Sequence, residues 1–228
     1  MASLRSYEDP CGIARALDLI GERWALLIVR ELVLGPKRFT DLRGGLAGAS
    51  PNVLSQRLRE LEAAGVVRRR AAGAATYELT EWGQELHPIL LQLGRWGAGS
   101  PLRPAGELSV DALLVALEST FVPEQAAEAR ATYELRLGEE RFTAAVDRGA
   151  LSITRGAPRK ADAVITTDAA TLRAVAFGDQ RLSEASAEGA LELTGDAASG
   201  RKFFRYFARP PRRTAAARAA AASSPRRA

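Results

Sequence analysis

The fold of the N-terminal half is decided by residues 50–65, SPNVLSQRLRELEAAG. Ser50 is a residue type that caps helix N-termini, and Pro51 suits the first helical position, where its missing N–H costs no hydrogen bond. Gly65 suits a left-handed cap at the other end. Leucines recur at the i, i+4, i+7 spacing of one buried stripe: Leu54, Leu58 and Leu61. The pattern predicts one amphipathic helix with both of its ends marked.

The face of this helix opposite the leucines carries amide, hydroxyl and guanidinium groups: Asn52, Ser55, Gln56 and Arg59. Such groups read base edges in the major groove of DNA. An ordinary helix with a solvated polar face is the alternative interpretation, because polar faces are common on protein surfaces.

The flanking sequence favours the DNA-binding interpretation. Residues 37–42, KRFTDL, follow Gly35-Pro36 and predict a short first helix of a helix-turn-helix, with Arg38 near its start. Residues 66–70, VVRRR, and 77–79, YEL, predict a β-hairpin after the recognition helix, which is a wing. Its cations are expected beside the phosphate backbone: Arg68, Arg69 and Arg70. Arg38 and Ser50 complete the predicted DNA contacts.

Residues 11–97 resemble the HxlR-type winged-helix regulators, relatives of MarR. The matching stretches are CGIARALDLIGERWALLIVRELVLGPKRFTDLR, SPNVLSQRLRELEAAGVVRRR and YELTEWGQEL with the Trp96-Gly97 ending. The resemblance implies a homodimeric bacterial transcription factor that binds double-stranded DNA at a palindromic operator. It also implies that the subunits pair through residues 10–20 and 81–97. The uncharged wing tip AAGAA departs from the family and argues against minor-groove contact by the tip.

Composition narrows the class of protein. The chain has 228 residues, and its 46% hydrophobic content is normal for a globular protein. No run approaches the roughly 18 apolar residues of a membrane span, and the N-terminus lacks an apolar signal core, so we expect a cytoplasmic protein without a membrane partner. One cysteine and one histidine exclude a disulfide framework and a Cys/His zinc cluster. No phosphate- or dinucleotide-binding glycine motif is present. We expect no metal, no cofactor and no enzymatic activity.

The distribution of charge and the positions of glycine and proline divide the chain into two domains and a tail. Residues 1–99 carry a net charge of +2, residues 100–209 carry −2, and residues 210–228 carry +5. The high pI therefore reflects a basic Ala/Pro/Ser tail, which we expect to be disordered. The tail either strengthens phosphate binding or has no role. The Gly- and Pro-containing stretch 97–106, GAGSPLRPAG, marks a domain boundary. It predicts a linker at 100–107 between a winged-helix domain at 1–99 and a second domain at 108–209.

The second domain has the pattern of helices on a sheet. Residues 109–121 predict a helix, and short β-like runs separated by Gly-containing turns predict an antiparallel meander: 131–138, 141–149, 150–156 and 161–168. Residues 168–177 predict another helix, and 190–194 a last strand before a final helix. The whole chain is therefore expected to be α+β, with a sandwich-like second domain built on a mainly antiparallel sheet.

Two stretches of this half, ADAVITTDAATLRAVAFGD and ASAEGALELTGDAASGRKFFRYF, resemble the sterol-carrier-protein type of lipid-transfer domain. The resemblance implies an apolar tunnel for a lipid-like ligand. Period-two alternation turns Phe142, Ala144 and Val146 toward the interior, and with Phe177 they are the candidate pocket residues. The many small residues either leave room for a ligand or simply pack closely.

Cys11 stands just before the first predicted helix, where some HxlR-type proteins keep a redox-sensing thiol. The helix dipole favours its thiolate, whereas Glu8 and Asp9 oppose ionisation. A buried structural cysteine is the alternative.

The favoured function is a dimeric, sequence-specific DNA-binding regulator that responds to an apolar small molecule. A lipid-binding carrier or sequestering protein with a vestigial winged helix is one alternative. An architectural dimer whose second domain binds nothing is another. Arg59 and the wing arginines argue against a vestige.

Overall fold

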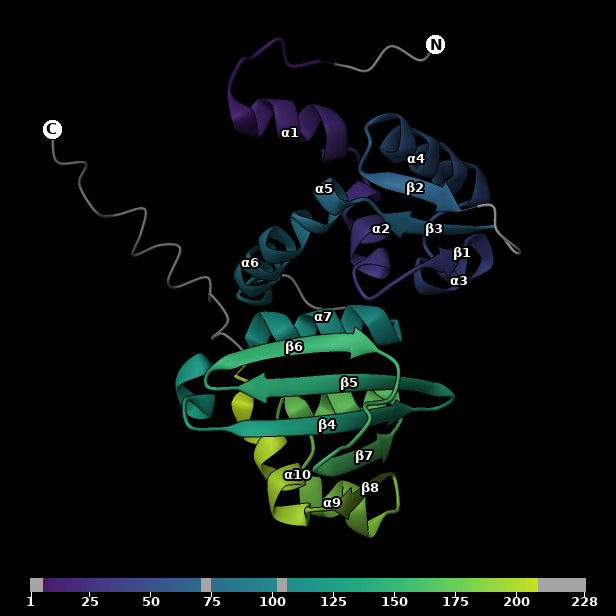
Figure 1. Cartoon of the computed structure of the whole chain (residues 1–228). Coiled ribbons are helices and arrows are strands. Elements are labelled where there is room, and N and C mark those ends of the chain that lie inside the picture. Colours follow the sequence, from purple (N-terminus) through teal and green to yellow (C-terminus); the bar gives the residue numbers. More distant parts are fainter. Residues whose placement is uncertain (1–5, 71–74, 102–105, 209–228) are drawn as a thin grey trace, which may run out of the picture.

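The computed structural model describes residues 6–70, 75–101 and 106–208. These residues form a winged-helix half and a sheet half, with helix α7 (Val110–Thr120) lying between them (Figure 1). The expected basic tail at 210–228, most of the wing tip and part of the expected linker lie outside the described residues.

The winged-helix half follows the predicted order of elements. Its helices are α1 (Gly12–Ile20), α2 (Ala25–Leu32), α3 (Phe39–Gly45), α4 (Pro51–Ala63), α5 (Glu81–Gln84) and α6 (Leu86–Ala98). Its strands are β1 (Lys37–Arg38), β2 (Val67–Arg70) and β3 (Thr76–Leu79), in the sheet order β1-β3-β2. The leucine stripe of α4 packs into a core that includes Ile28, Leu32 and Leu42, all fully buried.

The first helix of the helix-turn-helix is shorter than the sequence predicts. Lys37 and Arg38 are extended and pair with Tyr77 and Thr76 of β3, so the helix begins only at Phe39. The Asp41 carboxylate explains the boundary, because it accepts the Arg38 backbone N–H at 3.1 Å and so satisfies one N-terminal donor of the helix. The expectation of helix at Lys37 and Arg38 was therefore wrong.

The helix expected at 81–97 is interrupted at Glu85. Pro88 has no N–H to offer the carbonyl oxygen of Gln84, four residues earlier, so a continuous helix would lose a hydrogen bond there. Thr80 caps the short α5, because its hydroxyl accepts the Gly83 N–H at 2.9 Å.

The sheet half contains five strands in the order β6-β5-β4-β7-β8. They are β4 (Arg130–Leu137), β5 (Glu140–Asp147), β6 (Ala150–Arg155), β7 (Ala163–Thr167) and β8 (Leu191–Gly195). The helical segments are α7, η1 (Pro123–Ala126), α8 (Ala169–Ala176), α9 (Leu182–Ala187), α10 (Ala197–Phe203) and η2 (Phe204–Tyr206).

A mainly antiparallel sheet is confirmed, but the simple meander was wrong. Strands β4, β5 and β6 form a meander, after which the chain crosses and β7 pairs parallel with β4, Tyr133 opposite Ala163. Helix α9 was also not predicted. Its start is marked by the Glu184 carboxylate, which accepts the Arg181 N–H at 3.2 Å, and Ala185 is its buried residue.

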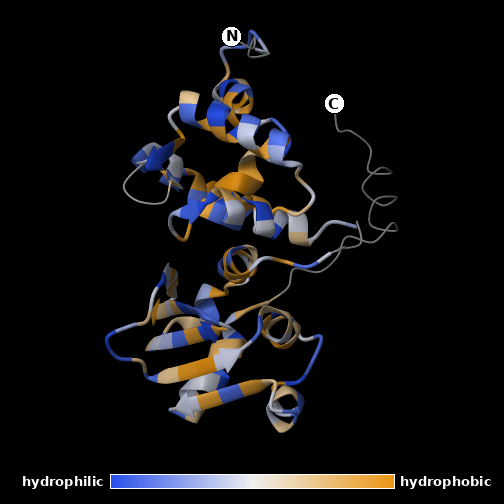
Figure 2. Ribbon diagram, turned by 90° about the vertical axis from the view of Figure 1, so that its right-hand side faces the viewer, coloured by the Kyte–Doolittle hydropathy of each residue, from blue (hydrophilic) through white to orange (hydrophobic). Residues whose placement is uncertain are grey.

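Hydrophobic and hydrophilic residues alternate along the strands of this sheet (Figure 2). The inward positions of β4 and β5 are buried, including Tyr133, Leu135, Phe142 and Ala144. Helices α7, α8 and α10 contribute to the core on that side.

Helix α7 joins the two halves. Nine of its eleven residues are buried, including Asp111 and Glu118. It contacts α2, α3 and α6 of the winged-helix half, and β6 and α8 of the sheet half. A helix buried on nearly all sides belongs to the interior of a protein. The apolar residues of both halves therefore form one continuous cluster.

Candidate DNA-binding interface

Helix α4 has the predicted start and end. The Ser50 hydroxyl accepts the Val53 N–H at 3.4 Å, Pro51 is the first helical residue, and Gly65 has a φ of +75°. Because the leucine stripe is buried, the orientation of the helix about its own axis is fixed. The opposite face is therefore presented outward.

Three of the four predicted base-reading residues are exposed: Asn52, Gln56 and Arg59. Ser55 is half-buried, and its carbonyl oxygen accepts the Arg59 Nε–H at 3.3 Å. The Gln56 amide donates to Glu60 Oε1 at 3.0 Å, so this side chain must leave Glu60 before it reads a base. Sequence reasoning missed Glu60, although its i, i+4 spacing from Gln56 is the signal that would have found it.

Arg57 holds α4 in place. Its guanidinium pairs with Glu60 and, at 3.5 Å, with Glu22 before α2. The side chain is only 16% exposed, so it is part of the packing of the domain. Arg38 is exposed at the end of strand β1, immediately before α3.

The three wing arginines have different environments. Arg68 Nε lies 2.5 Å from Glu78 Oε1, and Arg70 Nη1 lies 3.3 Å from Glu78 Oε2. Arg69 lies between them in the strand and opposite Tyr77, so its side chain points to the other face of the hairpin. All three are exposed. Glu78 was not singled out from the sequence, although it stands directly opposite Arg68 in the register of the hairpin.

The candidate pocket residues lie in the sheet half. Phe142, Ala144 and Val146 are buried on the inward face of β5, and Phe177 is half-buried at the end of α8. Aromatic rings occupy the space next to them: the centroids of Tyr133 and Phe203 are 4.9 Å apart. Burial raises the pKa of the Tyr133 hydroxyl, which lies 3.2 Å from Ser199 Oγ.

Two open grooves lie instead where the two halves meet. One, of about 430 Å³, is lined by residues such as Lys37, Asp41 and Arg155. The other, of about 680 Å³, is lined by residues such as Trp24 and Leu108. Neither includes the four candidate residues, so the apolar pocket stays a prediction.

The Cys11 thiol is exposed at the N-terminus of α1, which does not fit the alternative of a buried structural cysteine. Its backbone N–H donates to Asp9 Oδ1 at 2.8 Å.

A helix with an exposed amide- and guanidinium-bearing face, preceded by α3 and followed by an arginine-bearing hairpin, defines a winged helix-turn-helix DNA-binding domain. A family model described as HxlR-like helix-turn-helix matches residues 19–101. The chain belongs to this family, whose relatives below are named as transcriptional regulators.

Two relatives from Bacillus subtilis show the extent of the likeness. The HTH-type transcriptional regulator YvaP is 40% identical over 86 residues, which is 36% of this chain and 80% of YvaP. The regulator YybR is 35% identical over 94 residues, which is 40% of this chain and 75% of YybR. Among solved structures, the redox regulator HypR in its oxidized form is 34% identical, with a TM-score of 0.38. The match covers 42% of this chain and 100% of HypR.

The second half matches a different family model, described as alkyl sulfatase C-terminal, over residues 105–213. The sec-alkyl sulfatase PisA1 is 20% identical in its solved double mutant, with a TM-score of 0.41. That match covers 44% of this chain and 16% of the sulfatase chain. The specific resemblance to a sterol carrier is not confirmed by these matches. Within the three described ranges, no helix has the length and apolar character needed to cross a bilayer.

Proposed function

We propose that the protein is a homodimeric, cytoplasmic transcriptional regulator that binds a palindromic DNA operator, with α4 of each subunit in a major groove. The observation that carries this proposal is the exposed face of α4. Asn52 and Gln56 supply the bidentate amides that suit adenine, and Arg59 supplies the guanidinium that suits guanine. Ser55 lies beside them on the same helix.

The phosphate contacts come from the ends of the motif and from the wing. Ser50 and Arg38 lie at the starts of α4 and α3, and Arg68, Arg69 and Arg70 lie on β2. Arg69 is the strongest candidate among the wing arginines, because Arg68 and Arg70 already share the Glu78 carboxylate.

Exposed apolar side chains support the dimer. Ile13 and Leu17 on α1, and Ile89, Leu93 and Trp96 on α6, are all exposed; for Ile13 and Trp96 the exposed fractions are 72% and 73%. Exposed apolar patches on a protein surface mark association sites. Pairing through α1 and α6 hides these side chains and places two α4 helices on one DNA molecule.

For the sheet half we propose binding of an apolar small molecule, in the manner of a sterol carrier, by the interior lined by Phe142, Ala144, Val146 and Phe177. The apolar inward face of the sheet supports this proposal. For Cys11 we propose a redox-sensing thiol, supported by its exposure at the start of α1.

The test of DNA binding begins with selection of duplexes by the full chain from a randomised pool. Asn52→Ala and Gln56→Ala are each expected to weaken binding to the selected duplex by about 1–3 kcal/mol, while binding to a scrambled duplex barely changes. Gln125→Ala, an exposed glutamine of the sheet half, is the matched control. Equal losses on both duplexes would overturn the assignment of α4 as the reading helix.

A further inference from the structure

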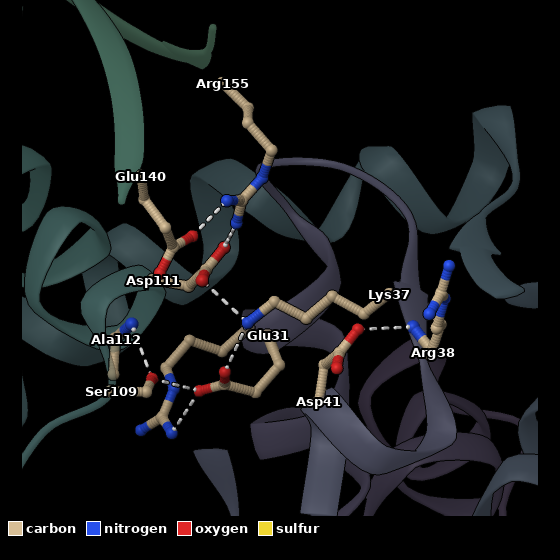
Figure 3. Close-up of polar contacts among 10 residues, drawn as sticks. Glu31, Lys37, Arg38, Asp41, Ser109, Asp111, Ala112, Glu140 and Arg155 are labelled. Atoms are coloured by element: carbon tan, nitrogen blue, oxygen red, sulfur yellow. Dashed lines mark hydrogen bonds and ion pairs between the residues drawn. The ribbon is translucent and has the colours of Figure 1, made fainter. Parts of the chain in front are cut away.

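A chain of charged side chains crosses from the winged-helix half into the sheet half (Figure 3). It begins at Glu31 of α2, whose side chain is fully buried. One carboxylate oxygen of Glu31 accepts the Ser109 hydroxyl at 2.7 Å and Arg30 Nη2 at 2.9 Å. The other accepts Lys37 Nζ at 2.8 Å. The carboxylate is therefore fully engaged by groups from both sides of the expected linker.

Lys37 carries the chain across the boundary. Its ammonium also lies 2.6 Å from Asp111 Oδ2 of α7, and Asp111 Oδ1 lies 2.7 Å from Arg155 Nη2 at the end of β6. Arg155 in turn pairs with Glu140 of β5 and lies over the ring of Phe142, 4.7 Å from its centroid. Counted from Glu31, five elements, α2, β1, α7, β6 and β5, are thus linked by consecutive ion pairs.

The two ion pairs of Lys37, with Glu31 and with Asp111, are largely removed from water. The Asp111 side chain is 2% exposed and that of Lys37 is 11% exposed. Although burial of Glu31 opposes its charge, Lys37, Ser109 and Arg30 together hold the pKa of this carboxyl below its usual value. Removing one member of a buried pair leaves its partner charged and unpaired, which is strongly unfavourable. The position of Lys37 is therefore dictated by Glu31 and Asp111, and its ammonium is not available to DNA.

Because Lys37 belongs to the wing sheet and lies next to α3, fixing its position also fixes the position of these two elements. Its backbone is strand β1, which pairs with Tyr77 of the wing strand β3. The next residue, Arg38, precedes the first helix of the helix-turn-helix. A displacement of Lys37 therefore moves the wing and α3 together.

A second contact lies toward the other end of α7. Glu118 Oε2 is 2.9 Å from His87 Nε2 of α6, and Glu118 Oε1 accepts the Ile153 N–H of β6 at 3.2 Å. Strand β6 thus contacts both carboxylates of α7, of which one holds β1 and the other holds α6. Through α7, the sheet half is therefore connected both to strand β1 of the wing sheet and to α6, the helix proposed for dimerisation.

We infer that Asp111 and Arg155 are positioning residues for DNA binding: through Lys37 they fix the orientation of the helix-turn-helix and wing relative to α6. In a dimer, that orientation sets the spacing of the two recognition helices, on which operator affinity depends. Binding to a single stretch of phosphates does not require this spacing. The inference rests on the proposed function and adds to it a role for the sheet half in specificity.

The test uses the full chain and a duplex that the unaltered protein selects from a randomised pool. Asp111→Asn keeps the shape of the side chain and removes its charge, and Arg155→Gln makes a change confined to the sheet half. Each variant is expected to bind the selected duplex about tenfold more weakly, a loss typical of coupling through packed networks. Affinity for a scrambled duplex is expected to stay within about twofold.

Arg136→Gln is the matched control. It removes the same charge from the same sheet, where Arg136 pairs with Glu134 rather than with α7, and it is expected to leave both affinities unchanged. The double variant Asp111→Asn/Arg155→Gln is expected to lose no more than about tenfold, because both changes break one connection.

The outcomes separate the two proposals. Selection of no duplex by the unaltered chain would overturn the proposed function and this inference with it. Selection of a duplex that Asp111→Asn and Arg155→Gln bind as tightly as Arg136→Gln does would overturn the inference alone. Equal weakening on selected and scrambled duplexes would assign the network to stability only. Arg155 is partly exposed, so its variant keeps the test decisive if Asp111→Asn does not fold.

Discussion

Glu78 limits the positive charge of the wing hairpin, which we propose contacts DNA phosphates. Its carboxylate lies between the guanidinium groups of Arg68 and Arg70, so these three side chains together carry one positive charge instead of two. Glu78→Gln removes the carboxylate and frees both arginines. The arginine side chains are 61% and 60% exposed, so water screens their side of both ion pairs, whereas the Glu78 side chain is only 11% exposed. Because glutamine keeps the shape of the buried side chain, the change is expected to act mainly on DNA binding, and urea unfolding of the variant checks that the fold is kept.

The expected size follows from counterion release. One additional phosphate contact steepens the plot of log affinity against log salt by about 0.9. Per contact, affinity then falls about threefold more between 50 and 200 mM salt. At low salt we expect Glu78→Gln to bind a scrambled duplex several-fold more tightly than the unaltered chain does.

Fluorescence anisotropy over a salt series measures this slope directly. Glu128→Gln, which removes an exposed carboxylate of the sheet half, controls for the change in net charge. If Glu78→Gln and Glu128→Gln give the same slope as the unaltered chain, Arg68 and Arg70 do not face phosphates and the wing assignment must be revised.

Two further expectations concern folding and assembly. Because the folded-state pKa of Glu31 is lowered from 4.5, its ionised form stabilises the fold above that pH, and this stability is lost as pH falls through the folded pKa. Glu31→Gln is thus expected to lower the free energy of unfolding by about 3 kcal/mol at pH 7 and by progressively less below pH 4.5. Urea unfolding at each pH checks this, and a loss that does not depend on pH would contradict it. Trp96→Glu is expected to convert the proposed dimer to a monomer in light scattering. Leu108→Glu, a change at an exposed leucine outside residues 10–20 and 81–97, is expected to leave it dimeric; an unchanged mass for Trp96→Glu would exclude α6 from the interface.

The sequence predicted correctly those helices and strands that are determined by residues close together in the chain. The start, buried stripe and end of α4 are each set by residues within one helix, and they were read correctly from residues 50–65. The same holds for β5, whose alternation placed Phe142 and Val146 on the buried face. The hairpin register even contains the pairing of Arg68 with Glu78, which sequence reasoning overlooked.

Features that depend on distant residues could not be predicted in this way. Lys37 is extended because it pairs with a strand 40 residues later, at Tyr77. The parallel pairing of β4 with β7 depends on a crossover that no local pattern specifies. The contact of Lys37 with Asp111 arises only when two separately recognisable domains pack on one helix.

The burial of α7 between the two halves changes how the chain is expected to unfold. A boundary rich in glycine and proline suggests two bodies on a tether, each able to melt alone. With α7 packed against α2 and α6 on one side and β6 on the other, separation exposes apolar surface on both. Heat is then expected to unfold the chain in a single cooperative transition. An N-terminal fragment that ends before α7 would leave the apolar side chains that α7 covers on α2 and α6 exposed to water.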